Sequence, residues 1–117
     1  MENRQESILQ KIRSFRDERD WQEFHTPKNL AISISIESGE LLENYQWTKP
    51  DDSPSVKQLE NIKHELADIY IYLSLLADGH EIDLLESVEQ KLILNNEKYP
   101  IDKARGNAKK YTCKSSK

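Results

Sequence analysis

Two acidic pairs, each set in apolar sequence with helical periodicity, constrain this chain more than any other feature. Glu37 and Glu40 form the first pair, and Glu65 and Asp68 form the second. Residues three apart lie on nearly the same face of an α-helix, so each pair directs its carboxylates the same way. Most acidic residues are ordinary surface, but leucine and isoleucine side chains surround both pairs. We therefore interpret the pairs as core-facing carboxylates rather than as solvated helix faces.

The pattern predicts one metal site divided between two helices. Carboxylates that share a cavity repel one another or take up protons unless a cation joins them. A ligand set of oxygens alone favours a hard cation, so we predict Mg2+, with Mn2+ as a substitute. The predicted metal ligands are Glu37, Glu40, Glu65 and Asp68. Glu43, a further turn along, is either an outer partner of this site or simply solvated.

Apolar periodicity without strand-like alternation predicts an all-α fold, a four-helix bundle. N-cap residues support the starts of three helices, namely Thr26, Ser53 and Asp83, and proline follows the first two. The expected helices cover residues 5–20, 27–46, 54–77 and 84–98.

The 117 residues suffice for one domain, which we expect over residues 1–100. Residues 101–117 contain six basic residues and one acidic residue, so we expect a basic, partly disordered C-terminal tail there. Apolar residues make up 36% of the chain and charged residues 32%, which leaves a thin core for a monomer. We therefore expect a homo-oligomer.

Composition and motifs argue against several classes of protein. The net charge of -4 offers no general attraction to nucleic acid, and the longest apolar run is too short to cross a bilayer. The N-terminus lacks the apolar segment of a signal peptide, and the single cysteine, Cys113, cannot form an intrachain disulfide. A cytoplasmic protein is therefore expected. Glycine-rich phosphate loops and the histidine spacings of zinc or di-iron sites are absent from the sequence.

Further motifs accompany the two acidic pairs. In chain order they are Trp21, Phe24-His25, Pro27, Asn29-Leu30, Gln46-Trp47, Tyr72, residues 95–100 and residues 109–111. With the acidic pairs, which 24 residues separate, they resemble the MazG-type all-α nucleoside triphosphate pyrophosphohydrolases, and among these the dCTP pyrophosphatase branch. The resemblance covers nearly the whole chain. One departure is the linker 47–55, which is short and acidic and could change how the pocket mouth closes.

The resemblance implies an activity and an assembly. It implies Mg2+-dependent hydrolysis of a nucleoside triphosphate to the monophosphate and pyrophosphate, in a homotetramer built as a dimer of dimers. The implied substrate is dCTP or a 5-modified dCTP, and the implied role is to clear unwanted deoxynucleotides from the pool.

Roles for individual residues follow from the mechanism and from the resemblance. For the mechanism, Glu40, with Glu37 beside it, is the predicted catalytic base, although the four carboxylates share one electrostatic site and sequence alone does not separate them. The resemblance supplies the contacts with the substrate. The predicted base pocket consists of Trp21, Trp47 and Tyr72. The predicted phosphate contacts are Lys91, Asn95, Lys98 and Tyr99, and for the two lysines a solvated helix end is an equally open interpretation.

Three alternatives stay open at this stage. The main one is a nucleotide-binding or regulatory helical oligomer that carries the site without turnover. The second is a nucleic-acid-binding module that uses the basic tail with Trp21 and Trp47, against which the net charge of -4 counts. The third is a purely structural homo-oligomer, which leaves the embedded carboxylates unexplained. Each histidine is interpreted as structural or exposed.

Overall fold

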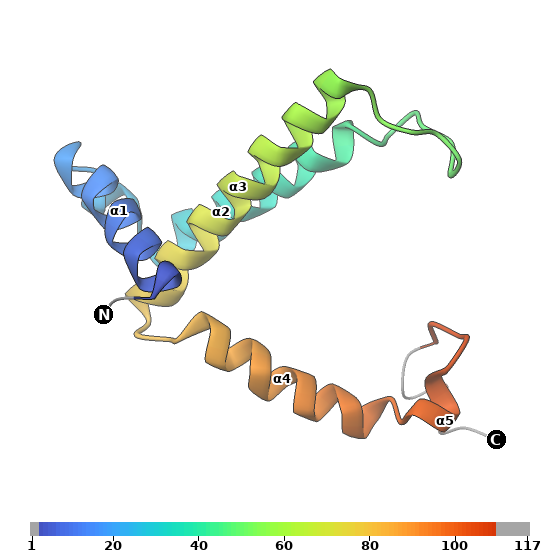
Figure 1. Ribbon diagram of the computed structural model, residues 1–117. Coiled ribbons are helices and arrows are strands. Elements are labelled where there is room, and N and C mark those ends of the chain that lie inside the picture. The colour runs from blue at the N-terminus through green and yellow to red at the C-terminus, as the bar shows by residue number, and fades with distance from the viewer. Residues whose placement is uncertain (1–2, 110–117) are drawn as a thin grey trace. The chain divides into compact units, whose positions relative to one another are not determined.

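The computed structural model describes residues 3–109 as helices joined by short connections (Figure 1). In chain order they are α1 (Arg4–Glu18), the short 3-10 helix η1 (Gln22–Phe24), α2 (Pro27–Glu43), α3 (Val56–Gly79), α4 (Leu84–Lys98) and α5 (Ile101–Ala104). No strand occurs in the described residues, and four of the helices are long, so the predicted all-α class is confirmed. The chain divides into two compact units, Met1–Glu81 and Ile82–Lys117, and each is described by itself.

Side-chain caps explain where most of the long helices begin. The Thr26 hydroxyl accepts a hydrogen bond from the backbone N–H of Asn29 at 3.2 Å, and Pro27 occupies the first turn of α2. The Asp83 carboxylate accepts one from the N–H of Glu86 at 3.0 Å and starts α4. Both predicted caps are confirmed.

The predicted start of α3 at Ser53-Pro54 is wrong, because Ser55 is the N-cap. Ser55 Oγ accepts from the N–H of Gln58 at 3.1 Å, and Gln58 Oε1 accepts from the N–H of Ser55 at 2.7 Å. This reciprocal capping box satisfies two backbone donors that would otherwise lack partners. Ser53 cannot form one, because the residue three positions later is Val56.

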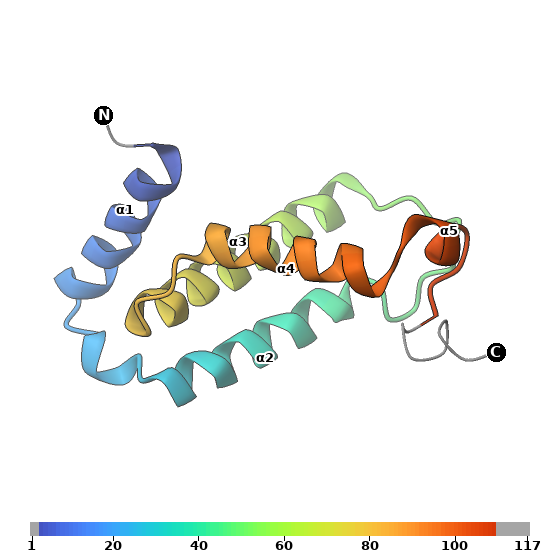
Figure 2. The same cartoon turned by 90° about the horizontal axis from the view of Figure 1, so that it is seen from below.

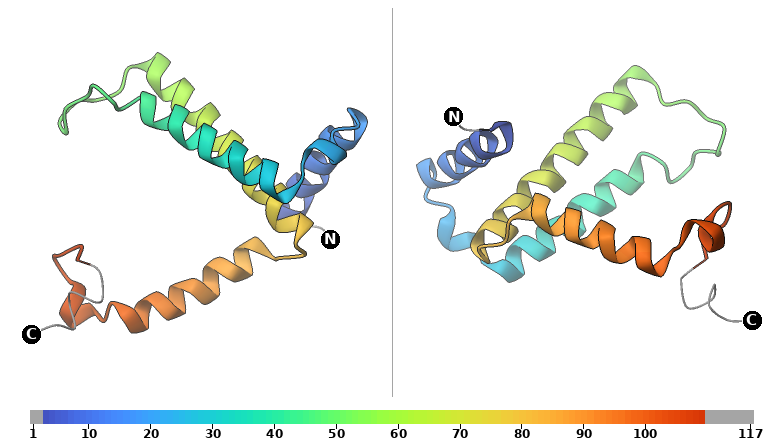
Figure 3. Two further views of the ribbon diagram at one scale, coloured as in Figure 1. Left: turned by 180° about the vertical axis from the view of Figure 1, so that it is seen from behind. Right: turned by 60° about the horizontal axis from the view of Figure 1, so that its bottom comes forward.

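The first unit is built on α2 and α3, which lie side by side and are joined at one end by residues 44–55 (Figures 2 and 3). α2 ends at Glu43, earlier than the predicted residue 46. The cause is Asn44, whose side-chain amide donates to the carbonyls of Glu40 and Leu41, each at 3.3 Å, and so caps the last turn.

The core of this unit lies where α1, the start of α2 and the end of α3 meet. Ile12, Leu30 and Leu75 form its buried centre, with Ile71 and Tyr72 among the half-buried residues around them. α1 is also tied to α3 by an ion pair, in which Arg13 Nε donates to Asp78 Oδ2 at 3.0 Å and Arg13 Nη2 donates to Asp78 Oδ1. This cluster therefore occupies one end of the α2–α3 pair, while Ile62, which is also buried, lies nearer the start of α3.

The second unit has a different character. α4 contains no buried residue, and five of its apolar side chains are 46–61% exposed. α5 lies within the segment predicted as a basic tail, which therefore begins with a helical turn. Residues 110–117, which include Cys113 and part of the 109–111 motif, lie outside the described residues. None of the described helices has the length and apolar character needed to cross a membrane.

Candidate metal and nucleotide site

The α2–α3 pair brings the two predicted acidic pairs together. One oxygen from each of Glu37, Glu65 and Asp68 lies within 4.8 Å of the others, although the first residue comes from α2 and the others from α3. All three side chains are half-buried. The antiparallel packing of α2 and α3 thus brings residues of both acidic pairs into one cluster, although 24 residues separate the pairs in sequence.

The cluster has the properties of a cation site. Glu37 Oε2 and Glu65 Oε2 are buried and have no hydrogen-bond partner among the described residues. The Glu65 carboxylate close beside it, then burial, then Glu40 raise the pKa of Glu37 from 4.5 to about 8. A carboxyl in this setting either holds a proton or needs a cation beside it. The donor set contains only carboxylate oxygens, so it fits a hard divalent cation.

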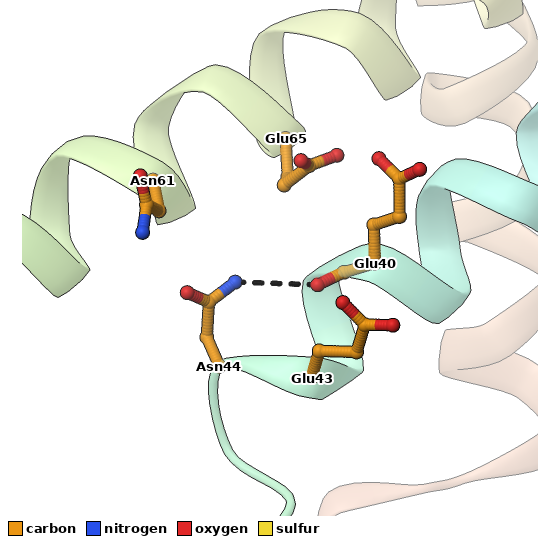
Figure 4. Close-up of a pocket in the computed structure, with 5 residues that line it drawn as sticks. All are labelled: Glu40, Glu43, Asn44, Asn61 and Glu65. Carbon is orange, nitrogen blue, oxygen red and sulfur yellow. Dashed lines mark hydrogen bonds between the residues drawn. The ribbon is translucent and has the colours of Figure 1, made fainter.

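Glu40 is placed differently from the other three predicted ligands. It is exposed, lies outside the tight group, and lines an adjoining hollow of about 280 Å³. The hollow is lined by Glu40, Glu43, Asn44, Asn61 and Glu65, and Figure 4 shows that these side chains come from facing sides of α2 and α3. Glu65 belongs to both the cluster and the hollow, so the two features are continuous.

A row of aromatic rings leads to the carboxylates. Trp21 contacts His25 edge-to-face, with ring centroids 6.2 Å apart, and His25 contacts Tyr72 in the same way at 6.3 Å. Burial, followed by the charges of Glu37 and Asp68, raises the pKa of Tyr72. Tyr72 therefore lies next to both the aromatic row and the carboxylate cluster. The structure brings together two of the three residues predicted for the base pocket, Trp21 and Tyr72.

His25 links these two rings, and the sequence interpretation missed its place. Its Nδ1 is buried without a hydrogen-bond partner among the described residues, and burial lowers its pKa below 6.5. This shift favours the neutral imidazole. A structural or exposed role was predicted for every histidine. The signal that could have singled out His25 is its place between Phe24 and Pro27 in the motif that carries the resemblance.

The remaining predicted site residues lie outside the α2–α3 pair. Trp47 lies in the turn after α2 and is 88% exposed. Lys91, Asn95 and Lys98 lie on α4, and Tyr99 is its C-cap. These four belong to the second unit, so their predicted contacts with phosphate stay predictions.

Comparison with known proteins places the chain in a family. Residues 32–112, which contain both acidic pairs, match the MazG-like family. The chain belongs to the MazG-like family. It is 41% identical to dCTP pyrophosphatase 1 of Bos taurus and 39% identical to that of Homo sapiens, over 92% of this chain and 68% of each relative. The predicted resemblance to MazG-type proteins is therefore confirmed.

The fold of this MazG-like chain is also similar to that of a solved structure. A pyrophosphatase from Archaeoglobus fulgidus superposes with a TM-score of 0.77 at 45% identity, over 86% of this chain and 95% of that one.

Proposed function

We propose that this chain hydrolyses nucleoside triphosphates to the monophosphate and pyrophosphate, and that its substrate is dCTP or a 5-modified dCTP. The chain is a nucleotide pyrophosphatase, as are its relatives that share 39–41% of its sequence. One observation carries the proposal. Glu37, Glu65 and Asp68 converge from two helices, and two of their oxygens are buried without a partner among the described residues.

We assign Mg2+ to this cluster, with Mn2+ as a substitute. Glu37, Glu65 and Asp68 would hold the cation, and Glu40 would complete the ligand set from the next turn of α2. When bound, such a cation offsets negative charge on the triphosphate oxygens and on the leaving pyrophosphate. The bare oxygens of Glu37 and Glu65 are the feature of the chain that this assignment explains.

Glu40 is the carboxylate that we assign as general base. Hydrolysis adds water across the bond between the α- and β-phosphates, so the water must lose a proton as its oxygen bonds to phosphorus. Glu40 is exposed to the hollow and lies outside the tight group of three, so its oxygens are open to a water molecule there. Glu37 is half-buried beside Glu65. We assign it a supporting catalytic role, in which it helps Glu40 to orient the reacting groups.

The aromatic row is the proposed base pocket. Trp21 and Tyr72 offer ring faces and edges to a pyrimidine, and His25 between them offers a buried nitrogen without a partner among the described residues. A neutral imidazole nitrogen without a proton can accept a hydrogen bond from the exocyclic amino group of cytosine, which uracil and thymine lack. A site built on such a bond discriminates more strongly than apolar walls do. Trp47 would close the pocket from the linker.

We further propose a homotetramer, a dimer of dimers, in which Lys91, Asn95, Lys98 and Tyr99 contact the phosphates. The exposed apolar side chains of α4 support self-association, because a helix with no buried residue gains little from its own unit. Light scattering coupled to size exclusion measures the assembly. A monomer at micromolar concentration would contradict this part of the proposal and leave the reaction itself untouched.

A product assay tests the reaction. The purified chain is incubated with each common and 5-methylated (d)NTP and Mg2+, and pyrophosphate is measured beside inorganic phosphate. We expect pyrophosphate from dCTP with wild type and none with Glu65→Gln. Glu60→Gln is the matched control, because Glu60 is exposed on the same helix and makes only long contacts, with Lys63 at 3.4 Å and His64 at 3.7 Å. Nucleotide binding without turnover would favour the alternative of a regulatory oligomer.

A further inference from the structure

One stripe of side chains on α3 runs from an amide through two carboxylates to an aromatic ring. Asn61, Glu65, Asp68 and Tyr72 follow one another at steps of four, three and four residues. Such steps keep side chains on one face of a helix. The ends of the stripe are 11 positions apart, or about 16 Å at 1.5 Å per residue. This is the scale of an extended nucleoside triphosphate.

The stripe has a direction. Its Tyr72 end packs against His25 and adjoins the aromatic row, which suits a base. Its middle is the carboxylate cluster, where the bond between the α- and β-phosphates would be broken. The part of a triphosphate that leaves must then extend beyond the cluster, toward Asn61.

Asn61 lines the hollow at that end and has N–H groups to offer. Of the five lining residues, three are carboxylates, which only accept hydrogen bonds when ionised. The Asn44 amide already donates to two backbone carbonyls at 3.3 Å. The Asn61 side chain makes no hydrogen bond with any of residues 3–109, and it projects from α3 one turn before Glu65 in Figure 4.

We infer that Asn61 donates its amide N–H groups to the terminal phosphates of the substrate and thereby favours triphosphates over diphosphates. The inference rests on the proposed function and adds a residue to it. Phosphates enter an acidic hollow only together with cations, and a neutral donor binds them there without adding charge. A nucleoside diphosphate, bound by its base and α-phosphate, would reach Asn61 less well.

Titration of pyrophosphate into the full chain in the presence of Mg2+ tests this assignment. Asn61→Ala should weaken pyrophosphate binding about tenfold, the size expected for one hydrogen bond to a charged group. Asn61→Asp should weaken it further, because a carboxylate repels the anion. dCMP binding should not change. The ratio of kcat/KM for dCTP to that for dCDP should fall by about the same factor in Asn61→Ala.

Gln10→Ala is the matched control, since it removes an exposed amide from α1, away from the hollow. Circular dichroism melting should show all variants folded, because Asn61 is exposed and makes no hydrogen bond with the described residues. Unchanged pyrophosphate binding in Asn61→Ala overturns the inference. So does binding by Asn61→Asp that equals or exceeds wild type, which would make residue 61 a cation ligand instead.

Failure of the proposed function gives a different result. In that case wild type hydrolyses no triphosphate. The pyrophosphate titration still measures the affinity of each Asn61 variant relative to wild type, so it tests the role of Asn61 separately. If wild type turns over dCTP and the Asn61 variants bind pyrophosphate normally, only the inference about Asn61 is overturned.

Discussion

Two groups of acidic side chains in the first unit have opposite electrostatics. Asp78, near the end of α3, accepts two hydrogen bonds from Arg13, and this contact holds the pKa of Asp78 below its usual value. Glu37 faces Glu65 and Glu40, and its pKa is raised to about 8. Among the described residues, the charged groups that shift the pKa of Glu37 are all acidic.

The difference separates a carboxylate that stabilises the fold from one that prepares a site. Arg13 balances the charge of Asp78, so this ion pair joins α1 to α3. The cluster around Glu37 places like charges together and leaves two oxygens bare among the described residues. Such an arrangement costs stability, and it is found where a ligand supplies the missing charge.

The sharpest test compares one substitution from each group. Glu65→Gln should lower dCTP turnover by about 100-fold or more, because it removes one of the negative charges that would hold the cation. Asp78→Asn should keep turnover close to wild type at a temperature well below unfolding, since Asp78 contacts α1 instead. Steady-state kinetics with saturating Mg2+ measures both. Equal losses in the two variants would contradict the division between site and scaffold.

Stability should show the reverse order. Asp78→Ala should lower the free energy of unfolding by about 1–2 kcal/mol at pH 7, because Arg13 loses a partly buried, charged partner. Urea unfolding measures the loss, and Arg13→Met with the double variant isolates the pair. A depressed folded-state pKa makes this stabilisation present above the unfolded pKa of Asp78 and lost as pH falls through the folded value. A double variant that is as unstable as the sum of the single variants would show that the pair is not coupled.

The pH dependence of the cation-free protein should run the opposite way for Glu37. Its folded pKa of about 8 lies above the unfolded value of 4.5, so the folded state binds the proton more tightly. The contribution of Glu37 to the free energy of unfolding is therefore fully present below about pH 4.5 and is lost as pH rises through about 8. Melting temperatures in EDTA should fall over this window, and added Mg2+ should raise them most at the alkaline end.

Glu37→Gln is the control for this titration, because it removes the group and should flatten the dependence. A melting temperature that stays constant or rises between pH 5 and 8 in wild type would count against the raised pKa.

The smallest expected effect concerns Gly39, which lies between Glu37 and Glu40. A Cβ built on Gly39 meets nothing within 4 Å, so packing in the described chain does not require glycine there. Gly39→Ala should raise the unfolding free energy by up to about 1 kcal/mol through helix propensity alone. Chemical unfolding at several protein concentrations measures it. A destabilised variant would mean that a second copy of the chain packs against this face of α2. The carboxylate cluster would then contribute to packing as well as to the site.

Much of the fold and part of the site follow from local sequence. The Thr26 and Asp83 caps and the two acidic pairs were predicted from spacing, because capping and helical faces depend on residues a few positions apart. The Ser55 cap was missed because two reciprocal side-chain bonds outcompeted the more visible Ser-Pro start. The end of α2 was missed because Asn44 caps it with its side chain.

Local sequence patterns are enough to specify a helical chain in which the carboxylates of each pair share a helix face. Which carboxylates meet depends on tertiary packing, because a distance such as 4.8 Å between oxygens is set by how α2 packs on α3. The same packing separated Glu40 from the tight group and placed His25 between Trp21 and Tyr72. It also put the Asn61 amide at the hollow, without a hydrogen-bond partner among residues 3–109. Contacts between segments distant in sequence have no local pattern, so they appear only when the helices pack together.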